Sequence, residues 1–155
     1  LMIHDLEIVR AMDGTHPVSV DAVGVPVFSR YEDIANARIR FASGCVANLT
    51  CSRISMDRMR KIRIFSPEMY VSTDYSAEEV LIYRKRPGEL VPGQNPMDLI
   101  SVDSLPVAHE EPLRLELASF IRCVRDRTRP VVDGEDALQA LTLAQQIIDC
   151  IRTSP

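Results

Sequence analysis

The histidine at position 4 is the side chain of this sequence that is best placed for proton transfer. His4 opens a stretch with helical spacing and is followed by Asp5. The amide groups at a helix N-terminus favour the neutral imidazole, which accepts protons near neutral pH. The other interpretation is a purely structural role, which composition alone favours for His4 and, more strongly, for His16 and His109. The sequence therefore offers His4 as one candidate base.

A second candidate site is a group of basic side chains in the middle of the chain. Arginine forks match the geometry of phosphate oxygens, so this group could hold a phosphate-bearing ligand. The other interpretation is a solvated loop followed by one face of a strand. The group is too small and too local for a nucleic-acid surface. Its members are Arg53, Arg58, Arg60, Lys61 and Arg63.

Motifs for a nucleotide site or a metal site do not occur in the sequence. There is no GxGxxG or GxxxxGK[ST] stretch and no nucleophile elbow. The cysteines lack the two-residue spacing of a zinc or redox pair, and they are Cys45, Cys51, Cys123 and Cys150. We interpret them as buried, reduced thiols of a cytoplasmic protein. We expect no metal site and no nucleotide site in this chain.

Length and composition describe one ordinary globular domain. The chain has 155 residues, of which 46% are hydrophobic and 26% charged, and a net charge of −4. These values exclude a disordered chain, a collagen-like repeat and a disulfide-rich small protein. The uncharged stretch 41–52 is too short and too polar to span a membrane. The negative charge gives no general attraction to nucleic acid or anionic lipid, so we expect neither partner.

Two strand-like runs, 34–41 and 45–54, are the clearest elements of the sequence. Each run alternates apolar and polar side chains, and Ser43-Gly44 between them suits a tight turn. A period of two predicts a sheet with one apolar and one polar face, and a tight hairpin predicts antiparallel pairing. The apolar face of the first run holds Ala35, Ala37, Ile39 and Phe41.

Helices and shorter strands surround this hairpin. The expected order is a helix over 2–12, a strand over 17–27, the hairpin, strands over 61–65, 70–74, 79–84 and 99–105, and two helices from Pro112 and Asp133. We expect the first C-terminal helix to turn Leu113, Leu117, Phe120, Ile121 and Val124 to the core. We expect the second to bury Leu138, Leu141, Ile148 and Ile151.

The pattern of elements predicts an α+β fold. We expect an open, mostly antiparallel sheet of six or seven strands with helices packed on one face. The polar face of the sheet is left uncovered, and it is either solvated or in contact with a partner through hydrogen bonds and water. This face carries Asn36, Arg38, Arg40, Asn48 and Thr50.

The order of several stretches resembles the glucose–fructose oxidoreductase / inositol dehydrogenase (Gfo/Idh/MocA) family. HDLEIV is similar to the start of that family's second domain, and the hairpin is similar to its central hairpin. The similar stretches are 4–9, 33–41, 44–49, 61–65, 111–113 and 133–138. The resemblance implies that 1–155 is the C-terminal α/β domain of a two-domain oxidoreductase. The N-terminal Rossmann domain, with its dinucleotide site and catalytic lysine, would be absent from this chain.

The family implies an NAD(P)-dependent dehydrogenase that acts on a sugar, nucleotide-sugar or polyol hydroxyl. In its D-x-x-x-H motif, the histidine matches His4 and the aspartate would lie one position before Leu1. The resemblance implies that His4 is catalytic, removing a proton from the hydroxyl as hydride passes to the nicotinamide. We assign substrate binding to Asp5, Arg58 and Arg60.

Within the family, the stretch 59–63 resembles members that are UDP-N-acetylglucosamine 3-dehydrogenases. The family also implies a homo-oligomer formed through the open sheet face. The cofactor, NAD or NADP, would bind to the other domain of the full-length protein, so we expect this fragment alone to bind none and to be inactive. The alternative interpretation is a non-catalytic dimerisation or ligand-sensing α+β module.

Overall fold

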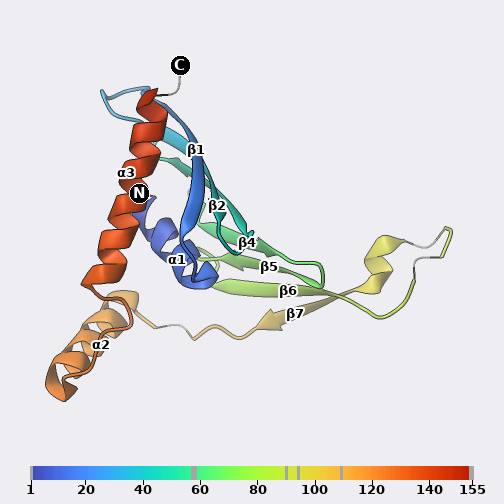
Figure 1. Ribbon diagram of the computed structural model, residues 1–155. Coiled ribbons are helices and arrows are strands. Elements are labelled where there is room, and N and C mark those ends of the chain that lie inside the picture. The colour runs from blue at the N-terminus through green and yellow to red at the C-terminus, as the bar shows by residue number, and fades with distance from the viewer. Residues whose placement is uncertain (1, 57–58, 90, 94, 109, 154–155) are drawn as a thin grey trace. The chain divides into compact units, whose positions relative to one another are not determined.

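A computed structural model describes residues 2–56, 59–89, 91–93, 95–108 and 110–153 (Figure 1). Arg58 and His109, both named above, lie outside the described residues. The elements are α1 (Ile3–Asp13), β1 (Pro17–Val25), β2 (Ile34–Phe41), β3 (Val46–Ser52), β4 (Lys61–Phe65), β5 (Met69–Asp74), β6 (Glu79–Lys85), the 3-10 helix η1 (Pro96–Leu99), β7 (Ile100–Leu105), α2 (Pro112–Asp126) and α3 (Gly134–Thr153). The chain forms two compact units, one of residues 1–56 with 119–155 and one of residues 57–118.

The first unit contains the predicted hairpin within an antiparallel sheet of order β1-β2-β3. In β2, Ala37, Ile39 and Phe41 are buried while the residues between them are exposed, as the alternation predicted. Gly44 has a φ of 91°, and its amide donates a 3.0 Å hydrogen bond to the Phe41 carbonyl. A glycine adopts this left-handed backbone without steric cost. The hairpin prediction is confirmed.

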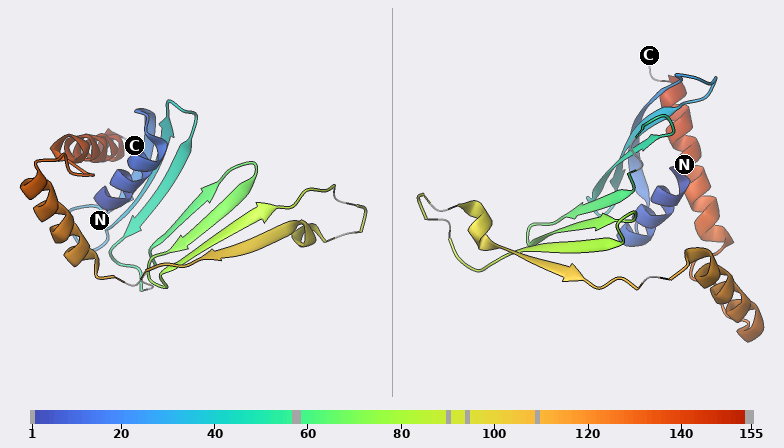
Figure 2. Two further views of the ribbon diagram at one scale, coloured as in Figure 1. Left: turned by 90° about the horizontal axis from the view of Figure 1, so that it is seen from below. Right: turned by 180° about the vertical axis from the view of Figure 1, so that it is seen from behind.

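Two helices cover the apolar face of this sheet. Figure 2 shows α1 and α3 on the same side of β1, β2 and β3. The first helix ends at Asp13 and is capped by Gly14, whose left-handed backbone lets its amide donate to the Arg10 carbonyl. Apolar side chains from both helices and all three strands make the core: Leu6, Ala22, Ala37, Ile39, Phe41, Leu49, Leu143 and Ile147. The prediction of helices on one face is confirmed for this unit.

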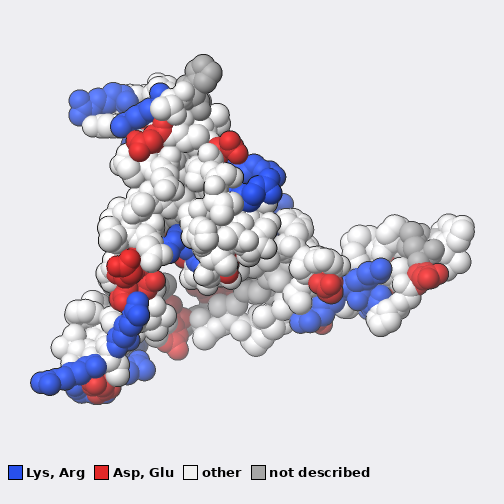
Figure 3. Space-filling model, viewed as in Figure 1, with Lys and Arg blue, Asp and Glu red and all other residues white. Residues whose placement is uncertain are grey.

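The N-terminus of α3 is built as the sequence predicted. The Asp133 carboxylate caps the helix by accepting hydrogen bonds from the amides of Glu135 (2.9 Å) and Asp136 (3.1 Å). The Asp136 carboxylate accepts in return from the Asp133 amide at 3.1 Å. Figure 3 shows acidic side chains gathered at this end of the helix. Negative charge there complements the positive end of the helix dipole.

The buried face of α3 differs from the one that the sequence predicted. Leu138 and Leu141, expected in the core, are exposed, and Ile148 and Ile151 are only half-buried. The side chains that this helix buries are Ala140, Leu143 and Ile147. The helix carries two apolar stripes, and periodicity alone does not say which of them meets the sheet. The small side chain of Ala140 allows close approach, so the less bulky stripe is the one inside.

The predicted core stripe of α2 is also wrong. The helix begins at Pro112 as expected, but none of its described side chains is buried. Its five apolar residues, expected inside, are between 53% and 64% exposed. Amphipathic spacing shows that a helix has an apolar face, but it does not show what covers that face.

The cysteines are less buried than predicted. Cys45 is exposed, because it belongs to the turn before β3 and not to the strand itself. Cys51, Cys123 and Cys150 are half-buried, and no disulfide joins any of the four. The thiol of Cys150 contacts the Val20 carbonyl at 3.6 Å.

The second unit is an antiparallel sheet of order β4-β5-β6-β7. Three aromatic side chains stack across its strands, with ring centroids 4.7 Å apart for Phe65 and Tyr70 and 5.0 Å apart for Tyr70 and Tyr83. Among the described residues there are seven strands, all paired antiparallel, and three α-helices. The α+β prediction is confirmed, with the strands divided by their hydrogen bonds into sheets of three and four. In the described parts of the chain, no helix has the length and apolar character needed to cross a membrane.

Candidate functional site

His4 lies in the first turn of α1 and its side chain is 77% exposed. Nδ1 of the imidazole is 3.5 Å from Oε2 of Glu7, one helical turn further along. The position before the helix, Met2, makes no side-chain cap, so α1 starts without a side-chain acceptor for its first amides. A histidine at this end therefore faces the positive end of the helix dipole, with a carboxylate beside it.

Sequence reasoning missed Glu7. The signal was present, since residues three apart on a helix are neighbours on its surface. The spacing of His4 and Glu7 on a predicted helix indicates that their side chains can meet. The structure brings Glu7, and not Asp5, to the imidazole of His4.

Asp5 points toward the sheet. The thiol of Cys51 in β3 donates to the Asp5 carboxylate, with Sγ and Oδ2 3.7 Å apart. Burial, reinforced by the negative charge of Asp5, raises the pKa of the Cys51 thiol, so the sulfur keeps its proton. This contact ties α1 to β3 immediately beside His4. Substrate binding by Asp5 stays a prediction.

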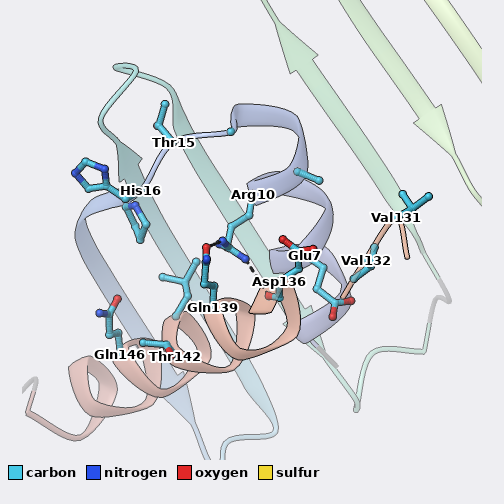
Figure 4. A pocket seen from close by; sticks show the side chains of 14 residues that line it. Glu7, Arg10, Thr15, His16, Val131, Val132, Asp136, Gln139, Thr142 and Gln146 are labelled. Carbon is cyan, nitrogen blue, oxygen red and sulfur yellow. Dashed lines mark hydrogen bonds between the residues drawn. The ribbon is translucent and has the colours of Figure 1, made fainter. Parts of the chain in front are cut away.

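A hollow of about 840 Å³ lies between α1, the connection that follows it and α3 (Figure 4). Arg10 reaches across it from α1. Its Nη1 donates to the Asp136 carbonyl at 3.1 Å, and its Nη2 donates to Oε1 of Gln139. Glu7 and Asp136 also line the hollow. Because the Arg10 guanidinium is bound to α3, it braces the two helices against each other.

The basic group is divided between the two compact units. Arg53 belongs to the first unit, where Nε donates to the buried Asp33 carboxylate at 2.5 Å. In the second unit, Nζ of Lys61 lies 2.8 Å from Oδ2 of Asp74. Arg60, just before β4, is exposed, and its backbone carbonyl accepts the Tyr75 amide at 2.9 Å. Two of the five cations thus neutralise carboxylates of the fold, and Arg60 keeps an exposed side chain.

The described residues contain no group of three or more histidine, cysteine, aspartate or glutamate side chains arranged to hold a metal ion. The candidate residues of the first unit are a histidine and a carboxylate at the start of α1. The second unit separately carries an exposed arginine, Arg60.

Comparison with known proteins shows which proteins this chain is similar to. No family model matches it. The chain is 30% identical over 149 residues to UDP-N-acetylglucosamine 3-dehydrogenase of Acidithiobacillus ferrooxidans, a match that covers 95% of this chain and 46% of that protein. A crystal form of the same enzyme superposes with a TM-score of 0.86 at 32% identity, over 97% of this chain and 47% of that one. The resemblance to the Gfo/Idh/MocA-type oxidoreductases is confirmed.

Two more distant solved structures share the fold. Aldose-aldose oxidoreductase of Caulobacter crescentus superposes with a TM-score of 0.74 at 23% identity, over 97% of this chain and 43% of that one. Levoglucosan dehydrogenase, in complex with NADH and levoglucosan, gives a TM-score of 0.80 at 15% identity, over 98% of this chain and 47% of that one. At these identities the likeness shows the fold alone. The chain spans about half the length of the relatives it matches.

Proposed function

We propose that this chain is the substrate-binding and oligomerising half of an NAD(P)-dependent oxidoreductase that acts on a hydroxyl of a sugar, nucleotide-sugar or polyol. The observation that carries the proposal is the match along 95% of the chain to about half of a UDP-N-acetylglucosamine 3-dehydrogenase. The cofactor belongs to the other half of the full-length protein, and the isolated chain has no activity. We also propose the cytoplasmic location predicted from the sequence.

His4 is the proposed general base. Its imidazole takes the proton of the substrate hydroxyl while the carbon that bears this hydroxyl loses hydride. A nicotinamide cofactor held by the other half of the protein would supply the hydride acceptor. The exposed imidazole at the start of α1 is accessible to a ligand.

Arg60 and Arg58 are the proposed ligands of a phosphate-bearing substrate, and Asp5 is proposed to bind a sugar hydroxyl. The support for Arg60 is its exposed side chain in a stretch similar to UDP-N-acetylglucosamine 3-dehydrogenases. Guanidinium groups form charge-assisted, forked hydrogen bonds to phosphate oxygens. A nucleotide-sugar is therefore the substrate class we favour, and its diphosphate is the part that these arginines would hold.

The assay for this proposal is NAD(P)H formation by the full-length protein supplied with UDP-N-acetylglucosamine. We expect turnover with the nucleotide-sugar, and we expect Arg60→Gln to raise its KM about tenfold with little change in KM for a neutral polyol substrate. Arg114→Gln, which removes another exposed arginine of the second unit, is the matched control and leaves both values unchanged. Absence of turnover with every sugar, nucleotide-sugar and polyol tested would instead favour a non-catalytic dimerisation or ligand-sensing module.

The open face of the β1-β2-β3 sheet is the proposed surface of self-association. Its polar side chains are already ordered by hydrogen bonds across the strands: Nη1 of Arg38 donates to Asn48 at 3.0 Å, and the Thr50 hydroxyl donates to Asn36 at 2.8 Å. A face whose side chains are held in place loses less conformational entropy when a partner docks.

Sedimentation equilibrium of the full-length protein tests this surface. We expect a homo-oligomer whose dissociation constant rises at least tenfold in Arg38→Glu, because the reversed charge would be placed in a desolvated interface. Arg114→Glu, the same charge change on α2, should leave association unchanged. A wild-type protein that stays monomeric at high concentration would contradict the proposal.

A further inference from the structure

The carboxylate nearest to His4 is that of Glu7. Oε2 of Glu7 is 3.5 Å from Nδ1 of His4, and the two side chains are 33% and 77% exposed. The carboxylate is thus partly shielded from water, while most of the imidazole is accessible. Catalytic hydrogen bonds are often long in empty sites and tighten when substrate binds. The pair has the composition of a base and the group that orients it.

The backbone that carries this pair is firmly held. Leu6, which lies between the two residues in sequence, is 1% exposed and belongs to the core. Asp5 is held by the Cys51 thiol, and Arg10, one turn after Glu7, is bound to α3. The inward side chains of α1 therefore fix the helix on the sheet. His4 and Glu7 form a pair whose relative position is set by the helix itself.

We propose that Glu7 is a positioning residue that selects the reactive tautomer of His4. A neutral imidazole carries one N–H, and the hydrogen bond made by one nitrogen decides which nitrogen that is. In this proposal the Glu7 carboxylate, 3.5 Å from Nδ1, moves closer and accepts a hydrogen bond from the Nδ1 proton, which leaves Nε2 without a proton. Exposed histidines otherwise favour the form protonated at Nε2, which has no lone pair on that nitrogen to receive a proton.

The chemical meaning of this tautomer rests on the proposed dehydrogenase function. During oxidation the substrate O–H and C–H bonds break and a C=O bond forms. The hydroxyl proton passes to Nε2 of His4, and the hydride leaves to NAD(P)⁺. His4 then carries a positive charge, which the neighbouring Glu7 carboxylate stabilises without itself taking the proton.

The tautomer can be measured without any turnover. In the 155-residue chain labelled with ¹⁵N-histidine, two-bond ¹H–¹⁵N spectra distinguish a protonated from an unprotonated ring nitrogen, and His4→Asn identifies the signals of His4. We expect His4 to be protonated at Nδ1 in the wild type and at Nε2 in Glu7→Ala. We expect Glu7→Gln to keep the wild-type tautomer, because its amide oxygen still accepts. A wild-type His4 protonated at Nε2 would overturn the proposal.

Kinetics of the full-length protein supply the second readout. Glu7→Ala is expected to lower kcat about 10- to 100-fold with KM unchanged. The kcat of Glu7→Gln should lie between that of Glu7→Ala and that of the wild type, because the amide orients the ring but does not stabilise the imidazolium. Glu116→Ala, which removes an exposed helical carboxylate of α2, is the control. Unchanged kcat in Glu7→Ala overturns the role of Glu7. If His4→Asn is fully active, the proposed function loses its base, and the spectra still report on the Glu7 contact separately.

Discussion

Replacing His4 with asparagine in the full-length protein is expected to lower kcat by about 10²- to 10⁴-fold, the range that general base catalysis contributes. Asparagine keeps a polar side chain of similar reach but has no nitrogen that can accept a proton. Because the His4 side chain is 77% exposed and outside the core, the fold does not depend on it. The loss should therefore appear in turnover and not in stability.

The dinucleotide provides an internal check of this result. In the proposed enzyme the cofactor is bound by the half that this chain lacks, so His4→Asn should leave its dissociation constant, measured by fluorescence titration, nearly unchanged. His16→Asn makes the same change at an exposed histidine in the connection after α1, and it should retain full turnover. Wild-type kcat in His4→Asn would remove the catalytic assignment of this residue.

The parts of the fold that could be predicted are those encoded by local patterns. The alternation in 34–41 predicts which side chains of β2 lie on the buried face and which on the exposed face, because successive side chains of a strand point to opposite sides. The turn glycine, the proline that begins α2 and the aspartate that caps α3 were each recognisable from a single backbone requirement. These features need no knowledge of what lies across the fold.

The helix faces could not be chosen from the sequence because that choice is tertiary. Leu141 and Leu143 have the same side chain two positions apart, yet one is 60% exposed and the other 1%. Two positions are about 200° apart on a helix, so the two side chains point to opposite sides, and the sheet covers only the side that carries Ala140, Leu143 and Ile147. In α2 the apolar residues have the spacing typical of a helix packed on a core, yet none of its described side chains is buried. Spacing alone therefore does not predict burial.

The same limit applies to the candidate site. His4 was recognisable from its position at a helix start, but Glu7 was not singled out, because it lies three positions away in sequence and one helical turn away on the surface. The basic group was defined by charge along the chain. Charge along the chain did not predict that Arg53 forms an ion pair with Asp33. The two residues are 20 positions apart, and the pairing of β2 with β3 brings them together.

The Asp33 carboxylate holds together the connection between β1 and β2. It is 4% exposed. Its Oδ2 accepts hydrogen bonds from the amides of Phe28 at 2.7 Å, Val27 at 2.8 Å and Ser29 at 3.0 Å, while Oδ1 accepts from Nε of Arg53 at 2.5 Å. These donors satisfy a carboxylate that would otherwise be buried without partners, and through them it holds the backbone of 27–29 in place.

We expect Asp33→Ala to lower the melting temperature by about 12 to 15 °C, one of the largest effects available to a single substitution in this chain. The alanine leaves three backbone amides and one guanidinium without their acceptor, and the connection can no longer close in its present form. Differential scanning calorimetry measures the change. Asp103→Ala removes a carboxylate that also pairs with an arginine but is 56% exposed, and it should shift the transition by no more than about 2 °C.

The effect of Asp33 has a defined dependence on pH. Hydrogen bonds from the backbone amides of Phe28 and Val27 hold the pKa of this carboxyl well below its usual range. The Ser29 amide and the Arg53 side chain add to this lowering. In the unfolded chain it titrates near its ordinary value of about 4, so its stabilisation is complete above that value and is lost as the pH falls further below it. The difference in melting temperature between wild type and Asp33→Ala should therefore be constant from about pH 6 to 8 and shrink below about pH 4. A difference that stays the same at acid pH would show that the charge of Asp33 does not stabilise the fold.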